Sequence, residues 1–554
     1  MKSVPYILFI LIVFQACTLH KKYDVVIHNG NIIDGSGSPS FISDIAINAD
    51  TIAFIGDLKK ATGKIEVDAA GLAVAPGFIN MLSWANESLI EDGRSQSDIR
   101  QGVTLEVLGE GESMGPLNGK MKQDMQKSQG DIKYDITWST LDEYLRFLEK
   151  RGVSPNIASF IGATTLRVYT VGYENRKPTV SELDTMKMLI RKAMEDVAVG
   201  LSSALQYVPA SFARKEELVE LCKETAGYDG LYISHIRDEG IKLLPCLDEF
   251  IKTSGESGIR GEIYHLKQSG KSSWGYLDEV VRKVDSARAA GLKITADMYN
   301  YIASSTGFDI IMPDWVQEGG FDAWAKRLAD PVIRKKITPD IHNAMVQRTG
   351  SADKVLIIGF NNDTLKYLTG KTLAEVAEMR KKSPEETVMD LIIQDQSRIG
   401  VVYFSMSEDN VKRQIALPWM RFCSDGGSYA NEGVFLKFST HPRAYGNFAR
   451  LLGKYVREDK VISLESAVNK LTSLPAENLK LRKRGAIKNG YYADLAIFDP
   501  GKIKDNATFE NPHQYATGMV HVFVNGVQVI KDGDHTGAKP GRVVRGPGWN
   551  QDSQ

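Results

Sequence analysis

Cysteine is scarce in this chain, which has four in 554 residues. Cys17 lies in the N-terminal segment, and only Cys222, Cys246 and Cys423 follow it. The three cysteines after Cys17 are an odd number, which argues against a disulfide framework, so packing must hold the core together. All three lie in apolar stretches, where a buried and inert thiol is the usual role. None of them is predicted to be a metal ligand.

An excess of charge of either sign is also absent. Sixty-eight Lys and Arg residues face 69 Asp and Glu residues, for a formal net charge of -1. No overall field therefore draws the protein to nucleic acid, and we expect a small-molecule substrate. With 43% hydrophobic residues, a chain of this length can bury a large core and should hold more than one domain.

Residues 1–17 have the pattern of a targeting segment. Lys2 supplies a positive start, a short apolar run follows, and a small residue directly precedes Cys17. This pattern resembles a bacterial lipoprotein signal, with Cys17 as the lipidated first residue of the mature chain. An ordinary cleaved signal or a membrane anchor is the alternative. We expect an exported protein, either periplasmic or an outer-membrane lipoprotein of a bacterium, and lipid-anchored if Cys17 is acylated.

Two β-rich ends flank a middle of different character. Residues 18–74 and 476–545 show short alternating strands with Asn-Gly and Asp-Gly turns, which predicts one small β-sandwich domain built from both termini. Residues 75–475 alternate apolar strands with helical stretches. Eight such strands predict an α/β fold with a (β/α)8 TIM-like barrel, whose chemistry gathers at the carboxyl ends of its strands. A long connection at about 307–417 predicts an inserted subdomain over the barrel mouth.

Two histidines end successive strands of the predicted barrel. His235 and His265 each follow a short apolar run, and this pairing favours a divalent metal site, most simply Zn²⁺. An isolated histidine at such a place is more often a satisfied core residue, but two are harder to explain in that way. A catalytic zinc ion normally takes three protein ligands, and the glycine-rich loop after the second strand offers Glu110 or Glu112. We prefer Glu110 because it is closer to the end of the strand.

Other polar side chains converge on the same end of the predicted barrel. Asp425 ends the last strand and is the candidate general base and acid, with a turn or N-cap role as the alternative. Arg443 carries a planar fork that suits a substrate carboxylate, and Tyr299 and Ser305 are neutral donors that could lie beside it. Together they predict a small anionic substrate.

The chain resembles the amidohydrolase superfamily and, within it, the D-aminoacylase (N-acyl-D-amino-acid deacylase) family. The motifs that carry the resemblance include DVVIHNGNIIDGSG, GLSSALQYVPASFA, YISHIRDEG, DMYNYIASST, SDGGSYANEG and HPRAYGNFARLLGKYVRE. The resemblance implies hydrolysis of an N-acyl amide to a carboxylate and a free D-amino acid. It also implies zinc on His235 and His265, catalysis by Asp425, substrate-carboxylate binding by Arg443, Tyr299 and Ser305, and an oxyanion donor at Tyr207.

Two departures from the family pattern bear on the metal. Relatives carry a His-x-His pair where this chain has Leu82-Ser83-Trp84, and they place a cysteine ligand where this chain has GEGES. The first departure predicts the loss of a second metal position, and the second predicts that Glu110 replaces a thiolate. A single ion on two histidines and a glutamate remains workable for a hydrolase. The alternatives are a dipeptidase or cyclic-amide hydrolase on the same scaffold, and a catalytically silent binding lipoprotein.

Overall fold

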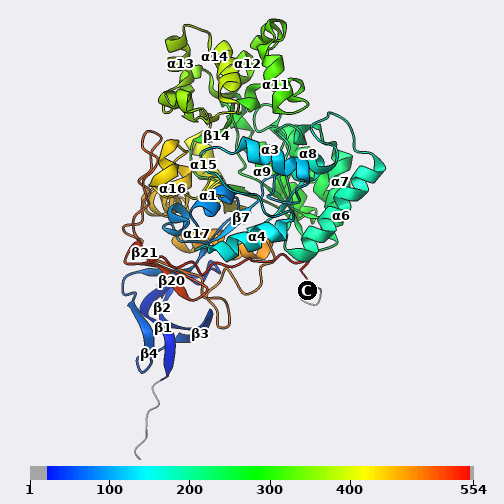
Figure 1. The fold of residues 1–554 in the computed structure, drawn as a ribbon. Coiled ribbons are helices and arrows are strands. Elements are labelled where there is room, and N and C mark those ends of the chain that lie inside the picture. The colour runs from blue at the N-terminus through cyan, green and yellow to red at the C-terminus, as the bar shows by residue number, and fades with distance from the viewer. Residues whose placement is uncertain (1–20, 550–554) are drawn as a thin grey trace, which may run out of the picture.

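The computed structural model describes residues 21–549 (Figure 1). The predicted signal segment lies outside these residues. The chain has mixed α/β content. Cys222 and Cys423 are buried and Cys246 is half-buried, all three as free thiols. Within the described range, no helix combines the length and apolar character needed to cross a bilayer.

One sheet joins the two ends of the chain. It follows the order β21-β20-β19-β18-β5-β1-β2-β3, with β4 paired to β1. In Figure 1 its N-terminal strands (blue) and C-terminal strands (red) lie together below the rest of the molecule. The N-terminal strands are β1 (Lys22–Ile32), β2 (Phe41–Asn48), β3 (Thr51–Gly56), β4 (Thr62–Asp68) and β5 (Ala73–Pro76). The C-terminal strands are β18 (Leu495–Phe498), β19 (Met519–Val524), β20 (Val527–Lys531) and β21 (Asp534–His535).

The central part of the chain contains two parallel sheets, ordered β6-β7-β8 and β17-β13-β12-β11-β10-β9. Backbone contacts connect them at both edges: Val199 N–H donates to the Ser159 carbonyl over 3.1 Å, and Ser83 forms a parallel bridge with Gly426. The strands of the first sheet are β6 (Phe78–Asn80), β7 (Val103–Leu108) and β8 (Asn156–Ser159). Those of the second are β9 (Ile161–Gly162), β10 (Gly200–Ala204), β11 (Leu231–His235), β12 (Arg260–Ile263), β13 (Ile294–Met298) and β17 (Met420–Phe422).

Helices cover the outer faces of these strands, so the strands are buried along their whole length, as parallel sheets usually are. Capping boxes define the starts of two helices: Thr140 with Glu143, and Thr179 with Glu182. Each box satisfies backbone N–H groups that the first helical turn leaves free. The covering helices include α4 (Leu141–Arg151), α6 (Val180–Asp196), α7 (Lys215–Ala226), α8 (Leu243–Ser257) and α9 (Leu277–Ala289).

A separate unit with its own apolar core lies between β13 and β17 in the chain and forms the top of Figure 1. Its antiparallel sheet consists of β14 (Ala303–Gly307), β16 (Gly400–Phe404) and β15 (Val355–Gly359). Its main helices are α11 (Phe321–Ala329), α12 (Pro331–Thr349), α13 (Leu373–Arg380) and α14 (Pro384–Asp395). Residues from this unit and from the ends of the parallel strands line one common pocket.

Candidate active site

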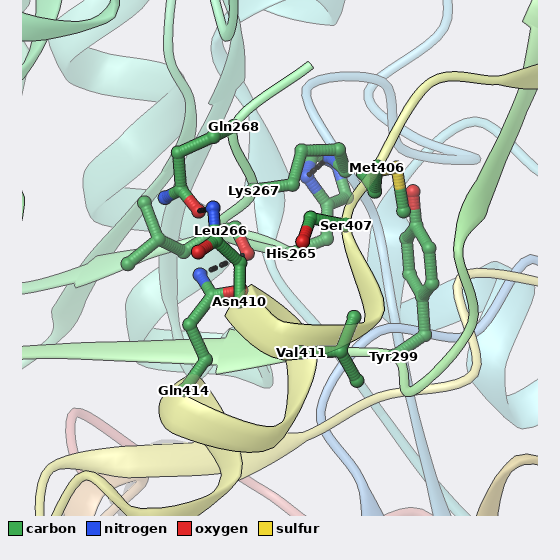
Figure 2. Close-up of a pocket in the computed structure, with 10 residues that line it drawn as sticks. All are labelled: His265, Leu266, Lys267, Gln268, Tyr299, Met406, Ser407, Asn410, Val411 and Gln414. Atoms are coloured by element: carbon green, nitrogen blue, oxygen red, sulfur yellow. Dashed lines mark hydrogen bonds between the residues drawn. The ribbon is translucent and has the colours of Figure 1, made fainter. Parts of the chain in front are cut away.

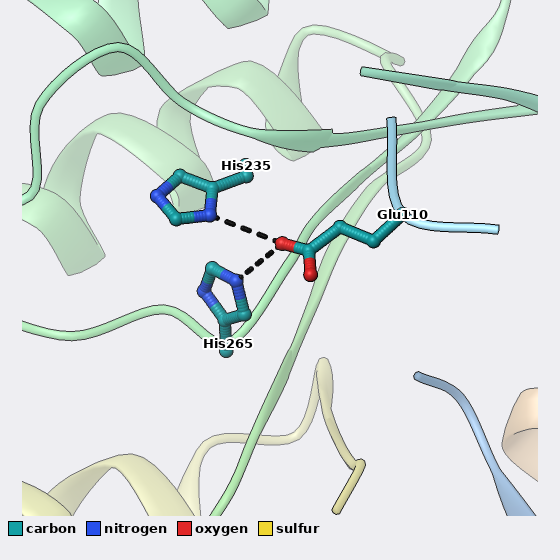
Figure 3. Close-up of side chains that lie close together, drawn as sticks. All are labelled: Glu110, His235 and His265. Carbon is teal, nitrogen blue, oxygen red and sulfur yellow. Dashed lines mark hydrogen bonds and ion pairs between the residues drawn. The ribbon is translucent and has the colours of Figure 1, made fainter. Parts of the chain in front are cut away.

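Three buried side chains meet where the parallel strands end. Glu110 follows β7, His235 is the last residue of β11, and His265 lies two residues beyond β12. Glu110 Oε1 is 3.0 Å from His235 Nδ1 and 2.8 Å from His265 Nε2. Figure 3 shows both imidazoles directed at this one oxygen. The three ligand atoms lie within 4.8 Å of one another, so the group has the size and donor set of a His₂Glu metal site.

The backbone of the loop after β7 decides which glutamate joins the histidines. Gly109 and Gly111 on either side of Glu110 have φ values of +96° and +65°, which an L side chain rarely adopts. A Cβ on Gly111 would also approach Ala204 to 2.5 Å. This tight turn directs Glu110 inward, whereas Glu112 is exposed on the pocket wall.

The outer nitrogens of both imidazoles are also occupied. His235 Nε2 is 2.8 Å from Gln206 Oε1, and His265 Nδ1 is 3.1 Å from Glu239 Oε1. A contact on the outer nitrogen fixes the orientation of each ring and keeps the inner nitrogen directed at Glu110. This second set of contacts therefore prepares Nδ1 of His235 and Nε2 of His265 to bind a metal ion.

The electrostatics of the three residues are those of a deprotonated glutamate between histidines. Burial opposes the charge on Glu110, but His265 and His235 together lower its pKa below the ordinary value. For His265, burial and Lys267 disfavour the charge, whereas Glu110 and Asp425 outweigh them and raise the pKa to about 10. In the absence of a metal, a proton therefore occupies the position between Glu110 and His265.

Asp425 lies beside this group and forms a buried ion pair. It follows β17 with a φ of +46°, and its Oδ2 is 2.8 Å from Arg443 Nη1. Burial raises the pKa of Asp425, and the guanidinium of Arg443 partly offsets this. Arg443 begins α16 (Arg443–Arg450) and lies 4.4 Å from the centre of the Tyr299 ring. The residue predicted to bind a substrate carboxylate thus contacts the candidate base directly.

Other predicted site residues line the same pocket. The Tyr299 hydroxyl and Arg443 Nε are buried without a hydrogen-bond partner among the described residues, so both remain available to a ligand. Ser305, on β14, donates to the Val401 carbonyl over 3.1 Å. The Tyr207 hydroxyl is 2.9 Å from Thr306 Oγ1, and its ring centre is 5.0 Å from that of His235.

The pocket that contains these groups has a volume of about 830 Å³, and the inserted unit supplies part of its wall. A much smaller cavity of about 10 Å³ lies behind His265 (Figure 2). Gln268, Asn410 and Gln414 line it, and its size is close to that of one water molecule. Of these two cavities, the large pocket is the one with room for an organic substrate.

Sequence reasoning did not select Lys267 or Gln206. Lys267 Nζ contacts Glu239 and lies 2.7 Å from His265 Nδ1, so this buried pair supports the second histidine. Lys267 follows His265 by two residues. In an extended segment this spacing places both side chains on the same face, and this was the sequence signal for Lys267. Gln206 gave no signal, because its role depends on the loop between β10 and α7.

Comparisons with known proteins agree on one family. A profile of the amidohydrolase family matches residues 312–530. D-aminoacylase of Alcaligenes xylosoxydans xylosoxydans is 31% identical over 530 residues, covering 95% of this chain and 98% of the enzyme. N-acyl-D-aspartate deacylase of the same organism is 30% identical, covering 96% of this chain and 97% of that enzyme.

Solved structures show the same relation. A crystal structure of D-aminoacylase has 31% identity and a TM-score of 0.78, with 94% of this chain and all of that chain covered. N-acyl-D-glutamate deacylase from Bordetella bronchiseptica, in complex with zinc and a phosphonate inhibitor, has 27% identity and a TM-score of 0.78, with 95% of this chain and all of that chain covered. A further D-aminoacylase structure has 31% identity and a TM-score of 0.79, with 94% of this chain and all of that chain covered. It concerns the binuclear metal centre of D-aminoacylase, with one-metal activation and second-metal attenuation. This chain therefore belongs to the amidohydrolase superfamily, in the group of D-aminoacylase and the N-acyl-D-amino-acid deacylases, and is a hydrolase of carbon–nitrogen bonds other than peptide bonds.

Proposed function

We propose that this protein hydrolyses the amide bond of N-acyl-D-amino acids at a single divalent metal ion, Zn²⁺, held at the mouth of a (β/α)8 barrel. The observation that carries the proposal is the convergence of His235 Nδ1 and His265 Nε2 on one oxygen of Glu110. These three residues would hold the ion. When bound, the ion supplies a Lewis acid that polarises the amide carbonyl and makes water more acidic.

Asp425 is the group that would move protons. Its carboxylate lies in the same pocket as the three ligand residues, with Oδ2 engaged by Arg443. Oδ1 accepts the Trp84 indole N–H over 3.2 Å, and its remaining lone pair would take a proton from the attacking water and return it to the leaving nitrogen. Burial raises the pKa of Asp425, which strengthens its carboxylate as a base toward the attacking water.

Arg443 and Tyr299 would orient the substrate through its free carboxylate. The unpartnered Tyr299 hydroxyl and Arg443 Nε offer two donors, and a buried donor without a partner favours an anion. Ser305, on β14, would add a third contact when its hydroxyl turns from the Val401 carbonyl to the carboxylate. Tyr207, adjacent to His235, would donate to the carbonyl oxygen as negative charge develops on it.

We further propose that the protein is exported and anchored to lipid through Cys17. The support for this is the positive start, the apolar run and the small residue before Cys17. Labelling of expressing cells with a radioactive fatty acid should mark the wild-type protein and not the Cys17→Ala variant. Labelling of both, or of neither, would contradict the anchor.

A substrate panel tests the enzymatic proposal. Purified residues 18–554, loaded with zinc, should release amino acid from N-acetyl-D-amino acids and much less from their L-enantiomers. Asp425→Asn keeps the shape of the side chain and removes the base, so kcat should fall by about 100-fold or more while zinc stays bound. Activity confined to dipeptides or cyclic amides would replace the proposal with the alternative hydrolases. Binding without turnover on the whole panel would contradict it.

A further inference from the structure

The backbone around Trp84 is fixed against the segment that carries Asp425. Trp84 N–H donates to the Gly426 carbonyl over 2.9 Å, and Asp425 N–H donates to the Leu82 carbonyl over 3.0 Å. Leu82 is fully buried, whereas Trp84 keeps 41% of its surface exposed and lines the large pocket. Two segments that lie 341 residues apart in sequence therefore form one wall of the site.

A single indole N–H connects the two carboxylates of this site. Trp84 Nε1 is 2.9 Å from Glu110 Oε2 and 3.2 Å from Asp425 Oδ1. The other oxygen of Glu110 receives the two histidines, and the other oxygen of Asp425 receives Arg443. Each carboxylate thus has one oxygen on Trp84 and the other on a cationic or metal-binding partner.

This arrangement has two physical consequences. Two ionised carboxylates repel one another in a buried site, and a shared donor between them reduces that repulsion. The same contact occupies Glu110 Oε2 and leaves Oε1 for the histidine side. An indole nitrogen is a donor only and cannot bind a cation, and Leu82 offers no ligand atom. Neither residue can therefore help to hold a second ion between the carboxylates.

We propose that Trp84 is a positioning residue that takes the structural place of a second metal ion. Its N–H holds Glu110 and Asp425 together, limits Glu110 to one coordinating oxygen and keeps the centre mononuclear. The proposal rests on the proposed function, because it assumes a metal ion on Glu110, His235 and His265.

The Trp84→Phe variant tests the hydrogen bonds, since it keeps an aromatic ring and removes the donor. Loss of this outer contact should weaken zinc binding by about 10-fold, measured by competition with a chromogenic chelator. The kcat for an N-acetyl-D-amino acid should fall about 10-fold, with KM changed less than about threefold, because the substrate-binding groups remain in place. The matched control is Trp315→Phe on the inserted unit, where the residue is 37% exposed, and it should behave as the wild type.

The Trp84→His variant tests whether Trp84 takes the place of a second metal ion. It places a metal ligand beside the same two carboxylates, so the protein should bind two zinc ions per chain instead of one. Wild-type zinc affinity in Trp84→Phe, or one ion in Trp84→His with a wild-type melting temperature, would overturn the proposal. If the wild type binds zinc but hydrolyses no N-acyl-D-amino acid, the proposed function fails, whereas the zinc affinity of Trp84→Phe still decides the role of Trp84.

Discussion

Zinc binding should release a proton, because His265 must lose one before Nε2 can coordinate. The surroundings of His265 raise its pKa to about 10 in the metal-free protein. At pH 7 the imidazole is therefore protonated. Because pH 7 lies about three units below this pKa, removing the proton costs about 4 kcal/mol. The apparent zinc affinity should rise about 10-fold for each pH unit between pH 6.5 and 8.5.

Two measurements check this linkage. Competition titrations across that pH range give the slope of the affinity, and calorimetry in buffers of different ionisation enthalpy counts the protons released. His265→Ala should abolish tight binding, whereas His342→Ala, on the exposed surface of the inserted unit, should leave the slope unchanged. Zinc affinity that is independent of pH, with no proton release, would show that His265 is not protonated in the metal-free protein and would refute this reasoning.

Three further predictions concern the same group of residues. Glu110→Ala should lose stoichiometric zinc and Glu112→Ala should retain it, as measured by mass spectrometry of bound metal. Arg443→Ala leaves Asp425 buried without its cation and should destabilise the protein by roughly 3–5 kcal/mol in urea unfolding; a loss under about 1 kcal/mol would show that the pair is not buried in solution. Because the pKa of His265 is raised on folding, the stability that this gives the metal-free protein is fully present below about pH 6.5 and is lost as the pH rises through about 10. Thermal unfolding with a chelator should show this decline above neutral pH, and a flat profile would contradict it.

The strands were the part of the fold most accessible from sequence. Parallel strands are buried on both faces, so they appear as short continuous apolar runs such as LYISH, which is β11. The helices were predicted from the helical stretches between these strands, one of which is α4 (Leu141–Arg151). Both signals are local, and this is why they could be read before the structure was known.

The contacts within the site were less accessible, because they join residues that are distant in sequence. Both Glu110 and Glu112 follow β7, and the positive φ values of Gly109 and Gly111 distinguish their directions only once the loop is folded. The pairing of Arg443 with Asp425 and the two acceptors of Trp84 depend on how separate loops meet. No periodicity or spacing in the sequence encodes such contacts.

The most direct test of the account is a zinc titration of the metal-free enzyme, followed by the rate of hydrolysis of an N-acetyl-D-amino acid. Activity should rise linearly and reach its plateau at one zinc ion per chain. A plateau that requires two ions, or activity that does not depend on zinc or another divalent metal, would contradict a single ion held by Glu110, His235 and His265.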